Sequence, residues 1–144
     1  MLYTSRDIED THKLVGEILK KIKSGDKAVV VGLSGDLGSG KTTFSQSVAK
    51  ILGVTEVVTS PTFIIEKLYH TKDTAFPQFI HIDAYRLDNA LELEVLGFTE
   101  LLNQKGTLIF IEWPERVKEI LPKDTRYIKF RFIDETTREI EYDF

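Results

Sequence analysis

The sequence predicts an α/β fold with a mixed, mainly parallel sheet, flanking helices and a C-terminal antiparallel hairpin. A nearly continuous β-branched run at residues 28–33 is typical of a strand buried on both faces of such a sheet. Segments with helical character at 4–23 and 41–52 precede and follow that run. From residue 128 onward, apolar and charged residues alternate, which is typical of strands with one buried face.

The length and composition limit the possible functions. A chain of 144 residues suits a single domain spanning 1–144, and roughly 68–70% of its unfolded surface can be buried. The absence of cysteine excludes disulfides, thiolate metal sites and cysteine nucleophiles. With 19 Lys and Arg against 23 Asp and Glu, the net charge of −4 argues against a free-standing nucleic-acid binder. No apolar run approaches the ~18 residues of a membrane span, and the N-terminal residues show no hydrophobic leader, so we expect a cytoplasmic protein without a membrane partner.

The first expected element is an amphipathic helix over 4–23. Its apolar residues fall on one stripe at helical spacing, namely Ile8, Val15, Ile18, Leu19 and Ile22. Thr4 or Ser5 is the expected N-cap. Gly16 lowers the helix propensity by ~1 kcal/mol, which indicates that another element packs closely at that position.

The remaining elements follow from apolar runs and from the glycines and prolines between them. After the strand at 28–33 we expect strands at 62–69, 79–83 and 107–112, and helices at 41–52, 90–97 and 114–121. Gly53 closes the second helix, and Pro114 opens the last one. The alternating residues at 128–132 and 140–144, separated by 134–137, predict the hairpin.

A glycine-rich motif lies between the buried strand and the following helix. Residues 35–42 fit G-x-x-x-x-G-K-[ST] in full, in the strand–turn–helix context that the motif requires. Such a loop surrounds phosphate oxygens with backbone N–H groups, and the helix N-terminus adds partial positive charge. Lys41 would reach the β- and γ-phosphates, and the Thr42 hydroxyl would bind Mg²⁺. The sequence therefore predicts a P-loop NTPase domain, with nucleotide contacts from Asp36, Leu37, Gly38, Ser39, Gly40, Lys41, Thr42 and Thr43.

Two carboxylates compete for the metal role in this prediction. Asp83 and Glu112 each end an apolar strand, where a P-loop site needs an acidic residue that holds Mg²⁺ directly or through water. A carboxylate at such a position is often an ordinary strand end. The spacing does not decide which of the two would bind the metal and which would orient the attacking water.

Three further residues have two interpretations each. Thr62, in a hydroxyl-rich turn, either meets Mg²⁺ or the γ-phosphate as part of a switch, or simply enters a strand. Arg86 is either a charge-stabilising finger or a surface charge. Trp113 beside Glu112 is more typical of packing or an interface than of catalysis.

Five blocks follow one another along the chain: the leading helix at 9–16, the P-loop at 35–44, Ser-Pro-Thr-Phe at 60–63, His-Ile-Asp-Ala-Tyr-Arg-Leu at 81–87 and Ile-Glu-Trp-Pro-Glu at 111–115. In these blocks and their order the chain resembles the bacterial ATPases of the TsaE family, also called YjeE, over nearly its whole length. Several blocks at family-like spacing are far more specific than the P-loop motif alone.

The resemblance implies a small P-loop α/β domain that binds ATP and Mg²⁺. It implies that Thr62 belongs to a switch, that Asp83 and Glu112 serve the Mg²⁺-ATP site with Lys41, and that Trp113 lies near the nucleotide. Family members support the threonylcarbamoyl modification of the adenosine next to the anticodon in tRNA. They hydrolyse ATP feebly alone and act with the proteins TsaB and TsaD. ATP turnover resets that complex, so tRNA is reached only indirectly.

Two other functions are compatible with the motif. A small-molecule kinase would use the same P-loop, but such kinases usually carry a long arginine-bearing lid, and the chain has no insertion of that kind. A non-catalytic switch would bind the nucleotide and present a docking face. The N-K-x-D and D-x-x-G motifs of GTPases are absent, and the adenine preference depends on the resemblance alone.

Overall fold

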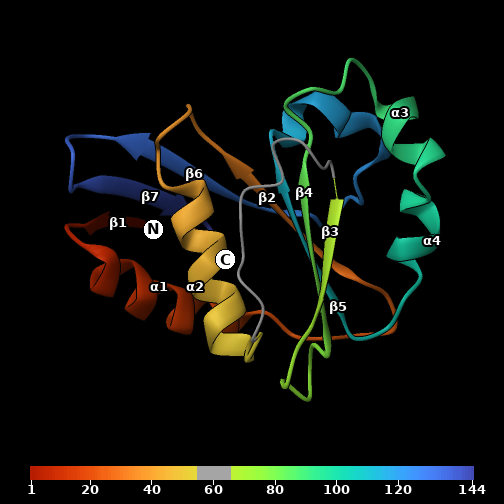
Figure 1. Ribbon diagram of the computed structural model, residues 1–144, viewed down its shortest axis with the longest axis horizontal. Coiled ribbons are helices and arrows are strands. Elements are labelled where there is room, and N and C mark those ends of the chain that lie inside the picture. Colours follow the sequence, from red (N-terminus) through yellow and green to blue (C-terminus); the bar gives the residue numbers. More distant parts are fainter. Residues whose placement is uncertain (55–65) are drawn as a thin grey trace.

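A computed structural model describes residues 1–54 and 66–144, and within them seven strands form one sheet in the order β1-β7-β6-β2-β5-β4-β3 (Figure 1). The strands are β1 (Leu2–Ser5), β2 (Val29–Ser34), β3 (Glu66–His70), β4 (Gln78–Asp83), β5 (Thr107–Glu112), β6 (Arg126–Phe132) and β7 (Arg138–Tyr142). The helices are α1 (Ile8–Lys21), α2 (Lys41–Leu52), α3 (Ala90–Val95), α4 (Phe98–Leu102) and the 3₁₀ helix η1 (Pro114–Ile120). None of the helices in the described ranges is long and apolar enough to cross a membrane.

The centre of the sheet is parallel and its edges are antiparallel. β2 pairs with β6 and β5, and β5 pairs with β4, all in parallel. β3 extends one edge, and β7 followed by β1 extends the other. The expected mixed sheet and C-terminal hairpin are therefore confirmed. Parallel neighbours end at the same edge of a sheet, and the register pairs Asp83 with Glu112 and Glu112 with Leu33 there.

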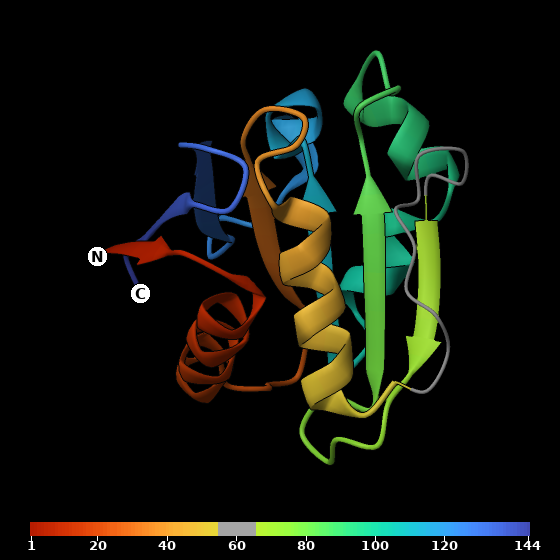
Figure 2. The same ribbon diagram turned by 60° about the vertical axis from the view of Figure 1, so that its left-hand side comes forward.

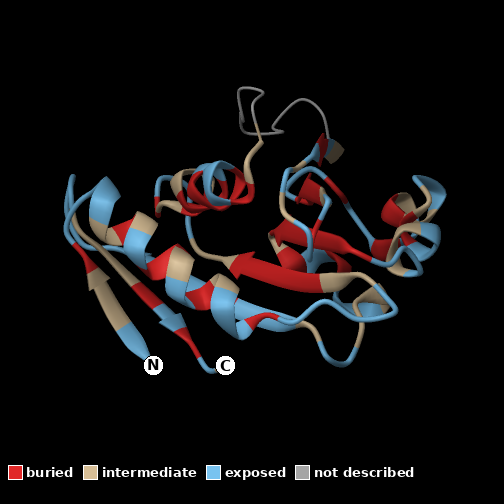
Figure 3. Cartoon of the chain, turned by 90° about the horizontal axis from the view of Figure 1, so that it is seen from below, coloured by how far each residue is buried: buried red, intermediate tan, exposed pale blue. Residues whose placement is uncertain are grey.

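Apolar side chains alternate between two cores, one on each face of the sheet. On β2, Val31 and Leu33 belong to the core with α1 and α2, whereas Val30 belongs to the core with α3, α4 and η1. Figure 2 shows helices on both faces of the sheet. All residues of β5 are buried. Figure 3 shows the buried residues along the central strands and on the inner sides of the helices. The strand predicted at 28–33 is thus covered by helices on both faces, as its composition indicates.

The N-terminal prediction is partly wrong. The segment expected to begin a helix at residue 4 forms β1, because its backbone pairs with β7. Helix α1 begins only at Ile8, and its N-cap is Asp7, which accepts a hydrogen bond from the Asp10 amide at 2.8 Å. The Ser5 hydroxyl contacts Thr11 Oγ1 at 2.7 Å instead of capping the helix. Gly16 faces α2, but an added Cβ would lie 4.0 Å from Ile51 Cδ1, so the packing there is ordinary and is not the close approach expected from the glycine.

Two other elements differ from the sequence prediction, and the start of a third is not tested. The helix expected at 90–97 is α3, and a second helix, α4, starts directly after Gly97, whose φ of +86° redirects the chain. The segment expected at 114–121 is a 3₁₀ helix. β3 begins at Glu66, and the predicted strand residues 62–65 lie outside the described residues. The helix at 41–52 ends at Gly53 as expected, with φ of +82°.

Gly32 lets η1 approach the sheet closely. A Cβ at this position would lie 2.9 Å from Pro114 Cγ and 2.9 Å from Tyr127 Cδ1. Since the proline ring cannot yield easily, we expect Gly32→Ala to lower the free energy of unfolding by about 1–3 kcal/mol. Denaturant titration measures this effect, and Gly25→Ala is the matched control because no described atom lies within 4 Å of its added Cβ. Equal unfolding midpoints for Gly32→Ala and the unsubstituted protein would contradict this account of the packing.

Candidate active site

The glycine-rich loop at 35–42 connects β2 to α2 and is held in left-handed backbone conformations. Gly35 has φ of +147° and Gly40, at the N-cap of α2, has φ of +104°. A Cβ at Gly35 would lie only 2.6 Å from the Phe130 carbonyl oxygen. Only glycine fits both positions without strain, so the loop has the wrapped course that a phosphate cradle needs.

A cavity of about 420 Å³ lies between this loop and the ends of β4 and β5. Most of the residues predicted for the site line it, namely Leu37, Gly38, Gly40, Lys41, Thr42, Thr43, Asp83, Glu112 and Trp113. The parallel register of β4 and β5 brings the two carboxylates to one edge, opposite the N-terminus of α2. We call this space the phosphate cavity.

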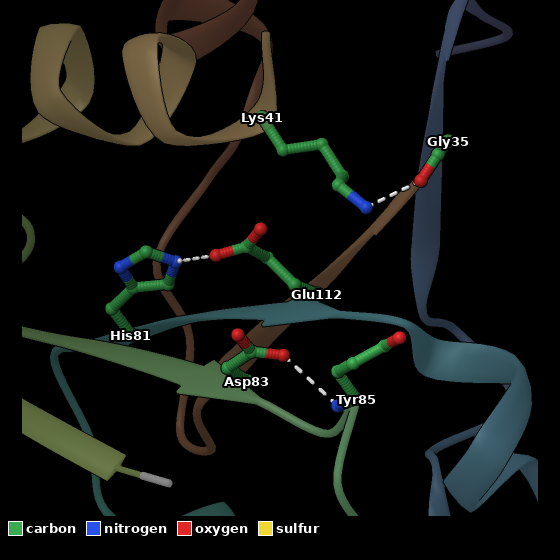
Figure 4. A network of polar contacts seen from close by, with 6 residues as sticks. All are labelled: Gly35, Lys41, His81, Asp83, Tyr85 and Glu112. Atoms are coloured by element: carbon green, nitrogen blue, oxygen red, sulfur yellow. Dashed lines mark hydrogen bonds and ion pairs between the residues drawn. The ribbon is translucent and has the colours of Figure 1, made fainter. Parts of the chain in front are cut away.

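Lys41 is a buried cation at the wall of the phosphate cavity. Its side chain is part of the first turn of α2, and the residue is 4% exposed. Nζ donates a hydrogen bond to the Gly35 carbonyl oxygen (Figure 4) and lies 4.1 Å from the centroid of the Trp113 ring. Burial lowers the pKa of the Lys41 ammonium, and the nearby Glu112 and Asp83 partly oppose this shift. An anionic ligand would therefore stabilise the charged form further.

Asp83 and Glu112 form a buried acidic pair on neighbouring strands (Figure 4). They are 9% and 4% exposed. Burial raises the pKa of Asp83, and the Glu112 charge adds to the rise, although Oδ1 accepts a hydrogen bond from the Tyr85 amide at 2.9 Å. Two adjacent buried carboxylates repel each other, and a divalent cation would offset this repulsion, so the geometry is typical of a metal site.

The donor set fits magnesium better than a metal that needs nitrogen or sulfur ligands. It consists of the two carboxylates and the Thr42 hydroxyl, all lining the phosphate cavity. Among the described residues no cluster of three or more His, Cys, Asp and Glu side chains could hold a metal by itself. Magnesium bound at phosphates takes one or two carboxylates and completes its shell with water and phosphate oxygens. The residues present therefore fit a magnesium–nucleotide complex.

His81 fixes the orientation of Glu112. The imidazole is fully buried on β4, and its Nε2 lies 2.7 Å from Glu112 Oε2. Glu112 uses Oε2 for this contact, which leaves Oε1 outside it. Asp83 uses Oδ1 for the Tyr85 amide, which leaves Oδ2 outside that contact. Either carboxylate thus retains an oxygen for a metal ion or a water molecule.

Trp113 occupies a strained position at the mouth of the site. With φ of +59°, it is the one non-glycine residue of the described chain in the left-handed region. Its amide donates a hydrogen bond to the Leu33 carbonyl oxygen at 3.3 Å, and the centroids of its ring and the Tyr85 ring lie 5.1 Å apart. This conformation places the indole over Lys41. Strain of this kind is frequent at functional sites.

Comparisons with known proteins agree with this architecture. The family model of the threonylcarbamoyl adenosine biosynthesis protein TsaE matches residues 5–140. The chain belongs to the TsaE family. The curated TsaE of Bacillus subtilis (strain 168) is 39% identical over 120 residues, covering 83% of this chain and 70% of the relative. The TsaE of Treponema pallidum (strain Nichols) is 36% identical over 143 residues, covering 97% and 98%.

A solved structure supports the fold of this TsaE-family chain. The crystal structure of YdiB from Bacillus subtilis superimposes with a TM-score of 0.76 and 28% identity, covering 97% of this chain and 82% of that chain. The similarity therefore extends over the sheet, the P-loop and the hairpin together. The resemblance to TsaE and the α/β fold predicted from the sequence are confirmed.

Not every residue predicted for the site lines the phosphate cavity of this TsaE-family protein. Ser39 is buried inside the loop, and Asp36 borders a different hollow beside β6. Arg86 is exposed and is not among the lining residues. Thr62, the predicted switch residue, lies outside the described residues.

Sequence reasoning assigned no site role to two residues that line the phosphate cavity, Tyr85 and Arg138. Arg138 at the start of β7 lines this space, and it also lines an adjoining cavity of about 610 Å³ beside the β1–α1 connection. We call the second space the outer cavity. The alternation of residues at 138–142 indicates a strand but gives no sign that its first side chain reaches the P-loop.

Proposed function

We propose that this TsaE-family chain is a Mg²⁺-dependent ATPase that supports the threonylcarbamoylation of the adenosine next to the anticodon of tRNA, together with TsaB and TsaD. The arrangement of charges around the phosphate cavity is the main support for this function. A buried lysine of a complete P-loop faces two buried carboxylates across a single cavity. This combination of one cation, two anions and a helix N-terminus suits a phosphate chain with its metal.

Each residue has a distinct task in this proposal. Lys41 binds the β- and γ-phosphates as a fixed charge, since Gly35 and Trp113 hold its ammonium at the cavity wall. Thr42 and one of the two carboxylates, Asp83 or Glu112, would hold Mg²⁺, which would neutralise charge on the phosphates. The carboxylate that does not bind the metal orients the attacking water and accepts its proton. A switch role for Thr62 stays a prediction.

The rest of the nucleotide fits the outer cavity. This space of about 610 Å³ shares Gly40 and Thr43 with the phosphate cavity, so a ligand can extend from one into the other. A pocket of 300–1,000 Å³ is typical for small ligands and cofactors. The choice of adenine over guanine is supported by membership of the TsaE family.

The proposed function also includes the partner proteins TsaB and TsaD. Relatives named for the biosynthesis of threonylcarbamoyladenosine share most of this chain, which supports a role in the same pathway. The net charge of −4 agrees with a protein that meets tRNA only within a complex. ATP turnover would then reset the TsaB–TsaD complex between rounds. A cytoplasmic location stays a prediction from the sequence.

The proposal is tested by measuring ATP hydrolysis by the chain alone and with purified TsaB–TsaD from the same organism. Lys41→Ala serves as the blank for contaminating activity. We expect a low basal rate that rises strongly when both partners are present. A basal rate that the partners leave unchanged would contradict the proposed role.

Product analysis separates this proposal from the two alternatives. The ATPase releases inorganic phosphate, whereas a kinase would transfer the phosphoryl group to a small alcohol, amine or nucleotide. A non-catalytic switch would bind ATP without hydrolysing it, so any turnover seen with the partners would arise in the partners and would survive both Asp83→Ala and Glu112→Ala. The proposed ATPase predicts that each of these variants loses it.

Thr42→Ala is expected to remove the Mg²⁺ dependence of ATP binding. The Thr42 hydroxyl is the metal ligand supplied by the P-loop, so ATP should bind the variant with similar affinity with or without Mg²⁺. Thr42→Ser, which keeps the hydroxyl, is the matched control and should behave like the unsubstituted protein. Calorimetric titrations with and without Mg²⁺ measure this, and an unchanged Mg²⁺ requirement in Thr42→Ala would count against the ligand role.

A further inference from the structure

Arg138 lies at the junction between the phosphate cavity and the outer cavity. It shares this position with Gly40 and Thr43, because these three residues line both spaces. The turn between β6 and β7 brings it there, beside the P-loop (Figure 2). A ligand that extends from one cavity into the other has to pass this side chain.

The turn holds the Arg138 side chain in place. Nη1 donates hydrogen bonds to the carbonyl oxygens of Asp134 and Thr137, the latter at 2.9 Å. Asp134 braces the turn, since its Oδ1 accepts from the amides of Thr136 at 2.9 Å and Thr137 at 2.8 Å. The guanidinium lies 4.6 Å from the centroid of the Phe132 ring. Arg138 is therefore a positioned cation rather than a mobile surface charge.

One donor of this guanidinium is buried without a partner. Arg138 Nε has no hydrogen-bond partner among the described residues, and no carboxylate there forms an ion pair with Arg138. It lies next to the P-loop, 3.8 Å from the place that a Cβ at Gly40 would occupy. Buried N–H groups nearly always have a partner in native proteins, so this one indicates a ligand that supplies an acceptor.

The orientation of the nucleotide in the two cavities determines which of its groups would accept the hydrogen bond from Arg138 Nε. Lys41 marks the β- and γ-phosphates, and Asp83 and Glu112 mark the metal beside them. Arg138 borders the outer cavity, in which the proposed function places the ribose and base. The phosphate between those two ends is the α-phosphate.

We propose that Arg138 binds the α-phosphate of the nucleotide through its Nε–H. The inference rests on the proposed function, because it requires a nucleotide in the P-loop. Arg138 contacts a phosphate that is not transferred, so it contributes to affinity and to the placement of the ligand. The chemical class that it recognises is a nucleoside di- or triphosphate.

Calorimetric titration of ADP tests this inference with three proteins: the unsubstituted chain, Arg138→Gln and Arg126→Gln. Arg126 lies at the opposite end of the hairpin and outside both cavities, so its variant controls for the lost charge. We expect Arg138→Gln to weaken ADP binding on the order of ten- to a hundredfold, as for a lost hydrogen bond to a charged group. Arg126→Gln should bind ADP normally.

Sulfur-substituted nucleotides separate a direct contact from a structural effect. The unsubstituted protein should discriminate between the two diastereomers of ADPαS, and Arg138→Gln should lose this discrimination. Both proteins should still discriminate against ADPβS, which reports on Lys41. Arg138→Lys, which keeps the charge but not the Nε–H geometry, should show the same selective loss and serves as the second variant if Arg138→Gln does not fold.

Three outcomes would overturn the inference. Normal ADP binding by Arg138→Gln would remove Arg138 from the site. Weakened binding with intact discrimination between the ADPαS diastereomers would show that Arg138 acts only through the shape of the turn. Absence of nucleotide binding by the unsubstituted protein would refute the proposed function as well, which distinguishes that failure from the first two.

Discussion

Lys41→Ala is expected to lower partner-stimulated ATP turnover by about 10²- to 10³-fold, the range measured when one charge-stabilising group is removed from an active site. The Lys41 ammonium is a buried cation in the wall of the phosphate cavity, at 4% exposure. Its removal leaves the γ-phosphate without its fixed positive charge. ATP affinity should fall in the same variant.

The control for this experiment lies on the same helix. Lys50 is exposed near the end of α2 and does not line the phosphate cavity, so Lys50→Ala removes an equal charge without touching the site. Its turnover and ATP affinity should match those of the unsubstituted protein. Undiminished turnover by Lys41→Ala would refute the assignment of 35–42 as a working P-loop.

Asp83→Asn is expected to bind ATP but to hydrolyse it about a hundredfold more slowly or worse. The substitution keeps the shape and the acceptor for the Tyr85 amide while it removes one negative charge from the acidic pair. Single-turnover hydrolysis and equilibrium binding measure the two effects separately. Glu112→Gln is the companion variant. Whichever of the two variants needs a higher Mg²⁺ concentration for turnover identifies the carboxylate that binds the metal. Normal turnover by Asp83→Asn would remove Asp83 from the chemistry.

Asp83→Asn should also raise the free energy of unfolding of the nucleotide-free protein at neutral pH. Burial raises the pKa of Asp83 in the folded protein, so the native state binds a proton more readily than the unfolded chain does. The ionised carboxylate therefore lowers stability, and this loss develops as the pH rises through the unfolded pKa toward the folded one. Asp83→Asn lacks the ionisation, so its free energy of unfolding should exceed that of the unsubstituted protein at pH 7 and match it more closely at low pH.

Local sequence patterns predicted the centre of the molecule well. The β-branched run at 28–33 indicates a strand buried on both faces, and the apolar run ending at Glu112 indicates a second strand. Both are central in the sheet. The P-loop motif places Lys41 at a helix start, and parallel pairing then brings the two strand-end carboxylates to the same edge. These features depend on nearest neighbours in the chain or on general rules of parallel sheets.

Features that depend on distant pairing could not be predicted in this way. The four residues of β1 are extended only because β7, from the other end of the chain, pairs with them. Arg138 joins the site through the same hairpin, and the contact of His81 with Glu112 depends on the register of β4 and β5. α4 spans only Phe98–Leu102, too short for helical periodicity to appear.

Counting modification events shows whether ATP turnover by this chain resets its partners. A limiting amount of TsaB–TsaD is given excess tRNA and an excess of activated threonylcarbamoyl donor, with ATP and either this protein or its Lys41→Ala variant. We predict many modified tRNAs per complex with the unsubstituted protein and no more than one per complex with the variant. Equal numbers of rounds with both proteins would contradict the account.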